Sequence, residues 1–127
     1  MGQTEHNRKT ILLVDDENEI LKMMTKMLEV GGYEVIPVNT PESALQESLS
    51  RREGLHLVIS DVMMPGMNGI ELCERIQTAF PGTRCLYMSG HAPESLNING
   101  VLKANLNFIR KPFGLKSLLD MVARILE

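Results

Sequence analysis

Hydrophobic residues in this chain follow two alternating patterns: short, nearly continuous runs, and longer stretches in which apolar residues recur with helical spacing. The short runs predict strands buried on both faces, at 10–14, 33–38, 56–60, 83–88 and 106–110. The helical spacing predicts five helices, through Ile20 to Leu28, from Pro41 to about Arg52, from Asn68 to Pro81, over 92–103, and over Leu115 to Leu126.

Local signals support these boundaries. Thr40 followed by Pro41 is typical of a helix start, and Asn68 with Glu71 three residues later has the spacing of a capping box. Pro37 lacks a backbone N–H, which favours an edge position for the strand over 33–38. The helix over 92–103 is predicted to be short, because it contains Asn and Gly.

Five strands alternating with five helices predict right-handed βαβ crossovers, and therefore an α/β fold with a parallel sheet covered by helices on both faces. In such sheets the functional crevice lies at the carboxyl ends of the strands. We expect residues 1–9, which are polar, to be a flexible lead-in and residues 10–127 to form one domain.

Composition narrows the function classes. The net charge of −3 argues against nucleic acid or an anionic membrane as a partner. No apolar run is long enough to span a bilayer, and the polar start lacks the core of a signal peptide. Cys73 and Cys85 have neither disulfide-framework nor metal-site spacing, so we expect core thiols in a reducing, cytoplasmic compartment.

The residues that follow the predicted strands carry the candidate chemistry. Asp15 and Asp16 follow the first strand, Asp61 the third, Ser89 the fourth and Lys111 the fifth. In a parallel sheet these positions share one edge. Three clustered carboxylates repel one another and should raise at least one pKa, unless a cation compensates them.

A magnesium ion fits this set, because it prefers a few carboxylate oxygens and shares a phosphate oxygen. Lys111 can pair with a phosphoryl oxygen, and Ser89 can donate a hydrogen bond to another. A carboxylate such as Asp61 can itself attack phosphorus and form an aspartyl-phosphate. The pattern therefore indicates phosphoryl transfer.

Four motifs make the chain resemble a receiver domain of the two-component response-regulator family: LLVDDE (12–17), ISDVMMPGMNG (59–69), YMSGHAP (87–93) and FIRKPF (108–113). The resemblance covers roughly residues 9–127. It implies a flavodoxin-like fold of five parallel strands in the order 2-1-3-4-5.

The resemblance also implies roles for individual residues. Asp61 is expected to accept a phosphoryl group from a phosphohistidine of a sensor histidine kinase or a histidine phosphotransfer protein. Mg²⁺ is expected on the side chains of Asp16 and Asp61 and on the backbone carbonyl of Met63, with Asp15 acting through a bound water.

Ser89 is expected to move toward the phosphoryl group and Lys111 to pair with it. Phe108 stands where the family has an aromatic switch residue, and it lacks the hydroxyl of a tyrosine. The bond before Pro112 is expected to be cis.

The family's signalling face combines the fourth and fifth helices with the fifth strand. We expect partner contacts, including those of a homodimer, around Leu96 to Lys116. The C-terminal part is similar to receivers of hybrid sensor kinases, which favours that origin over a stand-alone protein.

Other functions on this fold remain open. A magnesium-dependent phosphatase working through an aspartyl-phosphate typically has an acid at the position of Met63. A flavin or nucleotide site needs a phosphate-cradling loop after the first strand, where DDENE (15–19) is anionic. A pseudo-receiver that acts only as an interaction module would not need the complete set of acids, hydroxyl and lysine. His91 is most simply an exposed loop residue, and Arg110 a charge on the rim.

Overall fold

The computed structural model describes residues 8–51, 55–90 and 107–127. Its elements in chain order are β1 (Thr10–Val14), α2 (Asn18–Val30), β2 (Glu34–Val38), α3 (Pro41–Leu49), β3 (Leu57–Asp61), α4 (Gly69–Ala79), β4 (Arg84–Ser89), β5 (Phe108–Arg110) and α5 (Leu115–Leu126). The helix predicted over 92–103 lies outside the described residues. None of the helices in the described ranges has the length and apolar character needed to cross a membrane.

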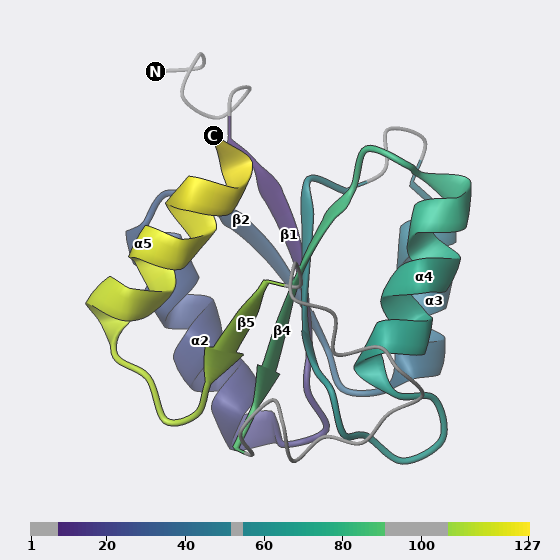
Figure 1. Ribbon diagram of the computed structural model, residues 1–127, viewed down its shortest axis with the longest axis horizontal. Helices are drawn as coiled ribbons and strands as arrows, with labels where there is room; N and C mark the ends of the chain where they lie inside the picture. Colours follow the sequence, from purple (N-terminus) through teal and green to yellow (C-terminus); the bar gives the residue numbers. More distant parts are fainter. Residues whose placement is uncertain (1–7, 52–54, 91–106) are drawn as a thin grey trace.

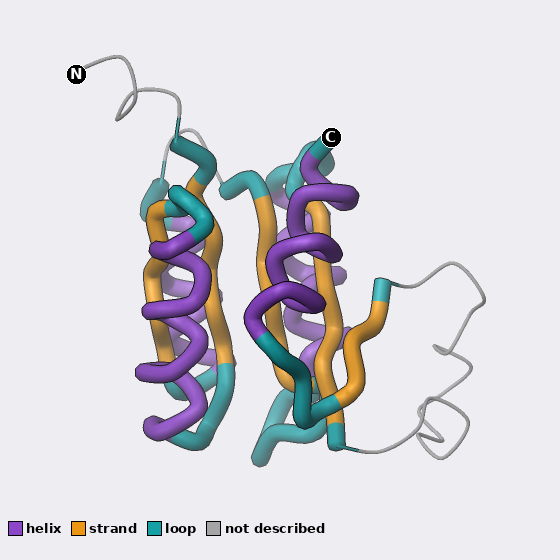
Figure 2. Tube along the Cα trace, turned by 90° about the vertical axis from the view of Figure 1, so that its left-hand side faces the viewer, coloured by secondary structure: helices purple, strands orange, loops and turns teal. Residues whose placement is uncertain are grey.

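The five strands form one parallel sheet in the order β2-β1-β3-β4-β5. Helices α2 and α5 cover one face, and α3 and α4 cover the other, as Figure 1 shows. Figure 2 shows the two helical layers on either side of the strands. The predicted doubly wound α/β fold and its strand order are confirmed.

Alternate residues of the central strands supply two separate core layers. Ile11 and Leu13 of β1 pack with buried side chains of α2 and α5, whereas Leu12 and Val14 pack with those of α3 and α4. All residues of β1 and β3 are buried. The backbone at Asp15, which follows β1, and at Asp61, which ends β3, is therefore held by packed strands on both faces of the sheet.

The helix starts predicted at Thr40 and Asn68 are confirmed. The Thr40 hydroxyl accepts a hydrogen bond from Ser43 N–H at 3.0 Å, and Asn68 Oδ1 accepts from the N–H groups of Ile70 and Glu71 at 2.9 Å each. Helix α3 ends at Leu49 rather than near Arg52. The Ser50 hydroxyl donates to the carbonyl of Glu47 at 2.9 Å, a local bond that competes with continuation of the helix.

The two edges of the sheet differ from the interior. Strand β2 is an edge strand, as its Pro37 predicts, and Pro37 is exposed. Strand β5 has only three residues and begins at Phe108, later than the predicted 106–110. Just before it, Asn107 accepts from Tyr87 N–H at 2.9 Å through its backbone, and its side-chain amide donates to the Cys85 carbonyl at 3.1 Å.

Candidate functional site

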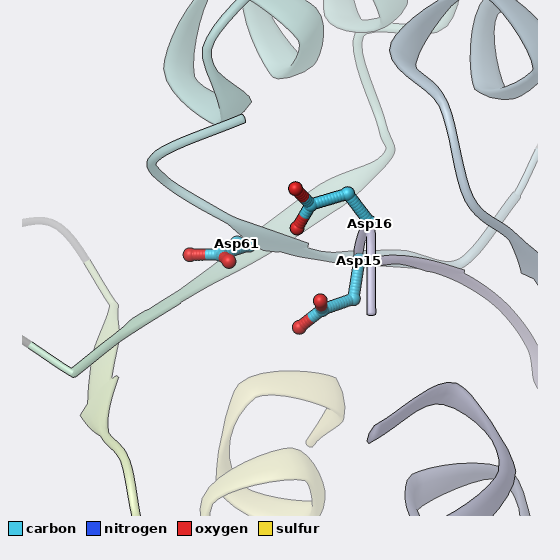
Figure 3. A group of neighbouring side chains, drawn as sticks. All are labelled: Asp15, Asp16 and Asp61. Carbon is cyan, nitrogen blue, oxygen red and sulfur yellow. The ribbon is translucent and has the colours of Figure 1, made fainter. Parts of the chain in front are cut away.

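Three carboxylates meet at the carboxyl end of the sheet. Asp15 directly follows β1, and Asp61 is the last residue of the neighbouring strand β3. Asp15, Asp16 and Asp61 each offer a carboxylate oxygen, and these oxygens lie within 4.8 Å of one another (Figure 3). Parallel pairing of β1 with β3 produces this convergence, because both strands end at the same level.

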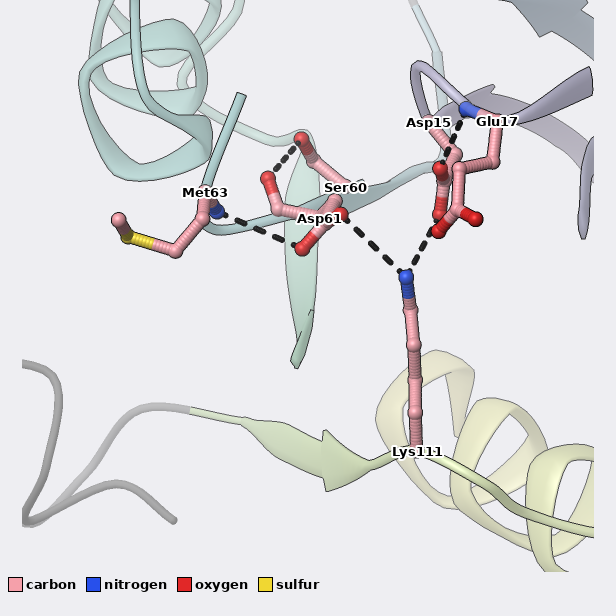
Figure 4. Close-up of polar contacts among 6 residues, drawn as sticks. All are labelled: Asp15, Glu17, Ser60, Asp61, Met63 and Lys111. Atoms are coloured by element: carbon pink, nitrogen blue, oxygen red, sulfur yellow. Dashed lines mark hydrogen bonds and ion pairs between the residues drawn. The ribbon is translucent and has the colours of Figure 1, made fainter. Parts of the chain in front are cut away.

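Lys111 reaches the same group from the end of β5. Its ammonium lies 2.9 Å from Asp15 Oδ2 and 3.3 Å from Asp61 Oδ2, so that it bridges the two acids (Figure 4). The Lys111 N–H donates to the Ser89 carbonyl at 2.8 Å, which ties the start of the lysine's loop to β4. The Lys111–Pro112 bond is cis, as expected.

Burial of this cluster makes its charged groups costly and shifts the pKa values of Asp61 and Lys111. Asp15 is fully buried, and its Oδ1 also accepts from Glu17 N–H at 2.8 Å. Burial, with a smaller contribution from the charge of Asp15, raises the pKa of Asp61, and Lys111 only partly offsets this. Burial acts to lower the pKa of Lys111, but its hydrogen bond to Asp15 and the charges of both acids raise that pKa overall.

Ser89 and Phe108 lie on the two strands that follow β3 in the sheet, β4 and β5. Asp61 is paired with Met88, and Ser89 follows Met88 as the last residue of β4, only 1% exposed. Phe108 is half-buried and is paired with Tyr87 across the β4–β5 ladder. The fold thus places Ser89 on the strand next to Asp61 and Phe108 on β5, one strand further out in the sheet.

The methionines of the turn after Asp61 differ in burial. Met64 is buried and Met67 is half-buried, whereas Met63 is 54% exposed beside the acids. The Met63 N–H lies 3.4 Å from Asp61 Oδ1, a long hydrogen bond that orients the carboxylate. Arg110 is exposed, as predicted for a rim charge, and His91 lies outside the described residues.

Sequence reasoning missed two residues that hold the backbone of Asp61. Ser60 is fully buried, and its hydroxyl donates to the Asp61 carbonyl at 2.9 Å. A Cβ on Gly69 would lie 2.2 Å from the same carbonyl oxygen, so only glycine fits there. The available signal was the single hydroxyl residue within the apolar run LVIS.

The model of the response regulator receiver domain family matches residues 11–123. The chain belongs to this family. Receiver domains are signalling domains of two-component systems that interact with histidine kinases or phosphotransfer proteins, and the predicted resemblance is confirmed.

Among curated relatives, some are similar over nearly their whole length and others over only part of it. The chain is 30% identical to the response regulator receiver protein CpdR of Brucella abortus, and the match covers 93% of this chain and 97% of CpdR. It is 35% identical to the response regulator FleR of Pseudomonas aeruginosa over 90% of this chain, yet spans only 24% of FleR.

Solved structures of receivers share the fold closely. The chemotaxis protein CheY4 of Vibrio cholerae superposes with a TM-score of 0.80 at 29% identity, covering 94% of this chain and 99% of CheY4. The receiver domain of the hybrid histidine kinase CckA gives a TM-score of 0.77 at 27% identity, covering 93% of this chain and 99% of that one.

Proposed function

We propose that this receiver domain is a phospho-accepting switch of a two-component phosphorelay in the cytoplasm, formed by residues 10–127 after a lead-in over 1–9. The observation that carries the proposal is the bridging position of Lys111 between Asp15 and Asp61, with Asp16 in the same acid group. The nucleophile Asp61, the compensating cation Lys111 and carboxylate oxygens that can bind a metal ion then lie at one edge of the sheet.

In the proposed reaction an Asp61 oxygen attacks the phosphorus of a phosphohistidine on a sensor histidine kinase or a histidine phosphotransfer protein. The O–P bond forms while the P–N bond breaks, and the imidazole leaves with the electron pair and takes up a proton. Lys111, which already contacts Asp61, then pairs with a phosphoryl oxygen. Ser89, at the end of the next strand, supplies a hydroxyl to another oxygen.

The acid group fits Mg²⁺, because all its side-chain donors are carboxylate oxygens within 4.8 Å of one another. We assign metal binding to the side chains of Asp16 and Asp61 and the backbone carbonyl of Met63, with Asp15 acting through a water. Mg²⁺ would supply positive charge that offsets repulsion between the carboxylates and the incoming phosphoryl group.

Phosphorylation is proposed to reach partners through Ser89 and Phe108. Phe108 packs against the core layer of α3 and α4 and has no hydroxyl, so it reports by packing alone. The controlled surface comprises β5, α5 and the segment from Leu96, of which residues 96–106 lie outside the described part. A homodimer through this surface, and an origin in a hybrid sensor kinase, belong to the same proposal; we assign no nucleic-acid contact to this domain.

We propose no turnover of an outside substrate, only self-catalysed phosphorylation and dephosphorylation of Asp61. Met63 occupies the place where a phosphatase of this type has a general acid, and a thioether cannot transfer a proton.

The test is labelling by acetyl phosphate, a small phosphoryl donor, in Mg²⁺ and in EDTA. The wild type should incorporate one acid-stable, alkali-labile phosphoryl group only with Mg²⁺, and Asp61→Asn should incorporate none. Asp120→Asn is the matched control, because Asp120 is an exposed acid whose only described contact is Lys116. Unchanged labelling of Asp61→Asn would refute the site.

Beryllofluoride with Mg²⁺, a phosphoryl mimic, provides an independent measurement. It should shift the NMR resonances of Asp61, Ser89 and the surface formed by β5 and residues 90–110. A spectrum identical with and without the mimic would count against the switch.

A further inference from the structure

We infer that Ser60 and Gly69 form a clamp on the backbone of Asp61, and that Ser60 is a positioning residue for phosphoryl acceptance. The inference rests on the proposed function. The clamp is the pair of contacts that these two residues make with the Asp61 carbonyl oxygen.

Ser60 is a polar residue in a strand that is buried along its whole length. Its neighbours across the sheet are Val14 on one side and Tyr87 on the other, and its exposed area is zero. A buried hydroxyl costs stability unless it is hydrogen-bonded. Its bond goes to the carbonyl of the next residue, at the point where β3 ends.

Gly69 packs against the same carbonyl oxygen and the Ser60 hydroxyl. An added Cβ would lie 2.2 Å from the Asp61 oxygen and 2.8 Å from Ser60 Oγ. The first residue of α4 therefore packs directly on the Ser60–Asp61 hydrogen bond. The Gly69 N–H also donates to the Val62 carbonyl at 2.9 Å, which fastens the turn back to the strand end.

The clamp matters for chemistry because the strand ladder ends here. Val62 N–H still donates to the Met88 carbonyl at 3.0 Å, but the hydrogen bond from Met63 N–H to the Asp61 carboxylate is long, at 3.4 Å. A carbonyl fixed by Ser60 and Gly69 sets the rotation of the Asp61 peptide, and therefore the direction of its carboxylate and of the Met63 backbone. Ser60 thus acts through Asp61, without touching the phosphoryl group.

Ser48 provides a matched control. It is also fully buried, and its hydroxyl also donates to a backbone carbonyl, that of Leu45, at 2.9 Å. It lies on α3, away from the acids. Ser60→Ala and Ser48→Ala therefore remove the same kind of bond at the same burial, and only the first removes it from the strand that carries Asp61.

The experiment compares wild type, Ser60→Ala and Ser48→Ala by Mg²⁺ titration calorimetry, acetyl phosphate labelling and urea unfolding in EDTA. Both variants should lose similar stability. Only Ser60→Ala should weaken Mg²⁺ binding, by about threefold to tenfold, and slow labelling by a similar factor. If Ser60→Ala does not fold, Ser60→Cys keeps the volume while its thiol is a weak donor, and the same two losses are expected.

Equal Mg²⁺ affinity and labelling rate in wild type and the Ser60 variant, with labelling intact in both, would overturn the clamp but leave the proposed function standing. A wild type that neither binds Mg²⁺ nor accepts phosphoryl would overturn both. If Ser48→Ala lost as much Mg²⁺ affinity and labelling rate as Ser60→Ala, the effect of Ser60 would be one on the stability of the fold and not on the position of Asp61.

Discussion

Replacing Lys111 by methionine should destabilise the metal-free chain far more than the same change at Lys116, although Lys116 makes the shorter ion pair. Lys111 bridges Asp15 and Asp61 at 2.9 and 3.3 Å, and the three side chains are 17%, 0% and 11% exposed. Lys116 lies 2.6 Å from Asp120, but these side chains are 88% and 65% exposed.

The size of each loss in stability depends on whether the carboxylates that lose their lysine are buried or exposed. Removing one partner of a buried ion pair typically costs about 3–5 kcal/mol, because the remaining charge stays buried without compensation. Lys111 is partly reached by water, and burial raises the pKa of Asp61 so that this acid can take up a proton. We therefore expect Lys111→Met to lower the free energy of unfolding by about 2–4 kcal/mol at neutral pH. The Lys116 pair is screened by solvent, and its loss should fall within measurement error.

Urea unfolding followed by circular dichroism in EDTA measures both changes, and repetition with excess Mg²⁺ tests the cause. A bound cation replaces the missing positive charge, so Mg²⁺ should restore most of the stability lost by Lys111→Met. The loss should also shrink as the pH falls, because the pKa of Asp61 is raised and its carboxylate loses its charge first by taking up a proton. A loss no larger than that of Lys116→Met would refute the reasoning.

Three further changes test the same site. Asp61→Asn should raise the free energy of unfolding of the metal-free chain at neutral pH, because burial raises the pKa of Asp61 and its charged form is therefore unfavourable in the folded state. In urea unfolding this gain in stability should vanish as the pH falls toward the ordinary pKa of 3.8. A gain that does not depend on pH would contradict this. Asp16→Asn should weaken Mg²⁺ binding by about tenfold in calorimetry with an unchanged circular dichroism spectrum, and unaltered affinity would remove Asp16 from the metal site. Gly69→Ala should cost about 3 kcal/mol in urea unfolding, whereas a Cβ on Gly82 meets nothing within 4 Å, so that Gly82→Ala serves as the control.

The sequence was sufficient to predict the edge of the sheet that carries the site. Asp15, Asp61, Ser89 and Lys111 each follow an apolar run, and the parallel topology carries strand ends to one level whatever their distance along the chain. Short-range chemistry also predicted the caps at Thr40 and Asn68, because each depends on residues within one turn.

Other features depend on contacts that no local pattern contains. The fit of Gly69 against the Asp61 carbonyl arises only when α4 docks on β3. The start of β5 at Phe108 depends on Asn107, whose amide bonds to the neighbouring strand. The preference of Lys111 for Asp15 over Asp61, 2.9 against 3.3 Å, follows from tertiary geometry as well.

The two outer strands of the sheet have a consequence for self-association. An incoming strand that approached β2 would meet Pro37, which has no N–H to donate, and an exposed charge at Glu34. At the opposite margin β5 offers three residues, too few for a lasting new ladder. Strand addition is therefore disfavoured at both of these edges, so that pairing of copies through β2 or β5 is not an available route to polymerisation.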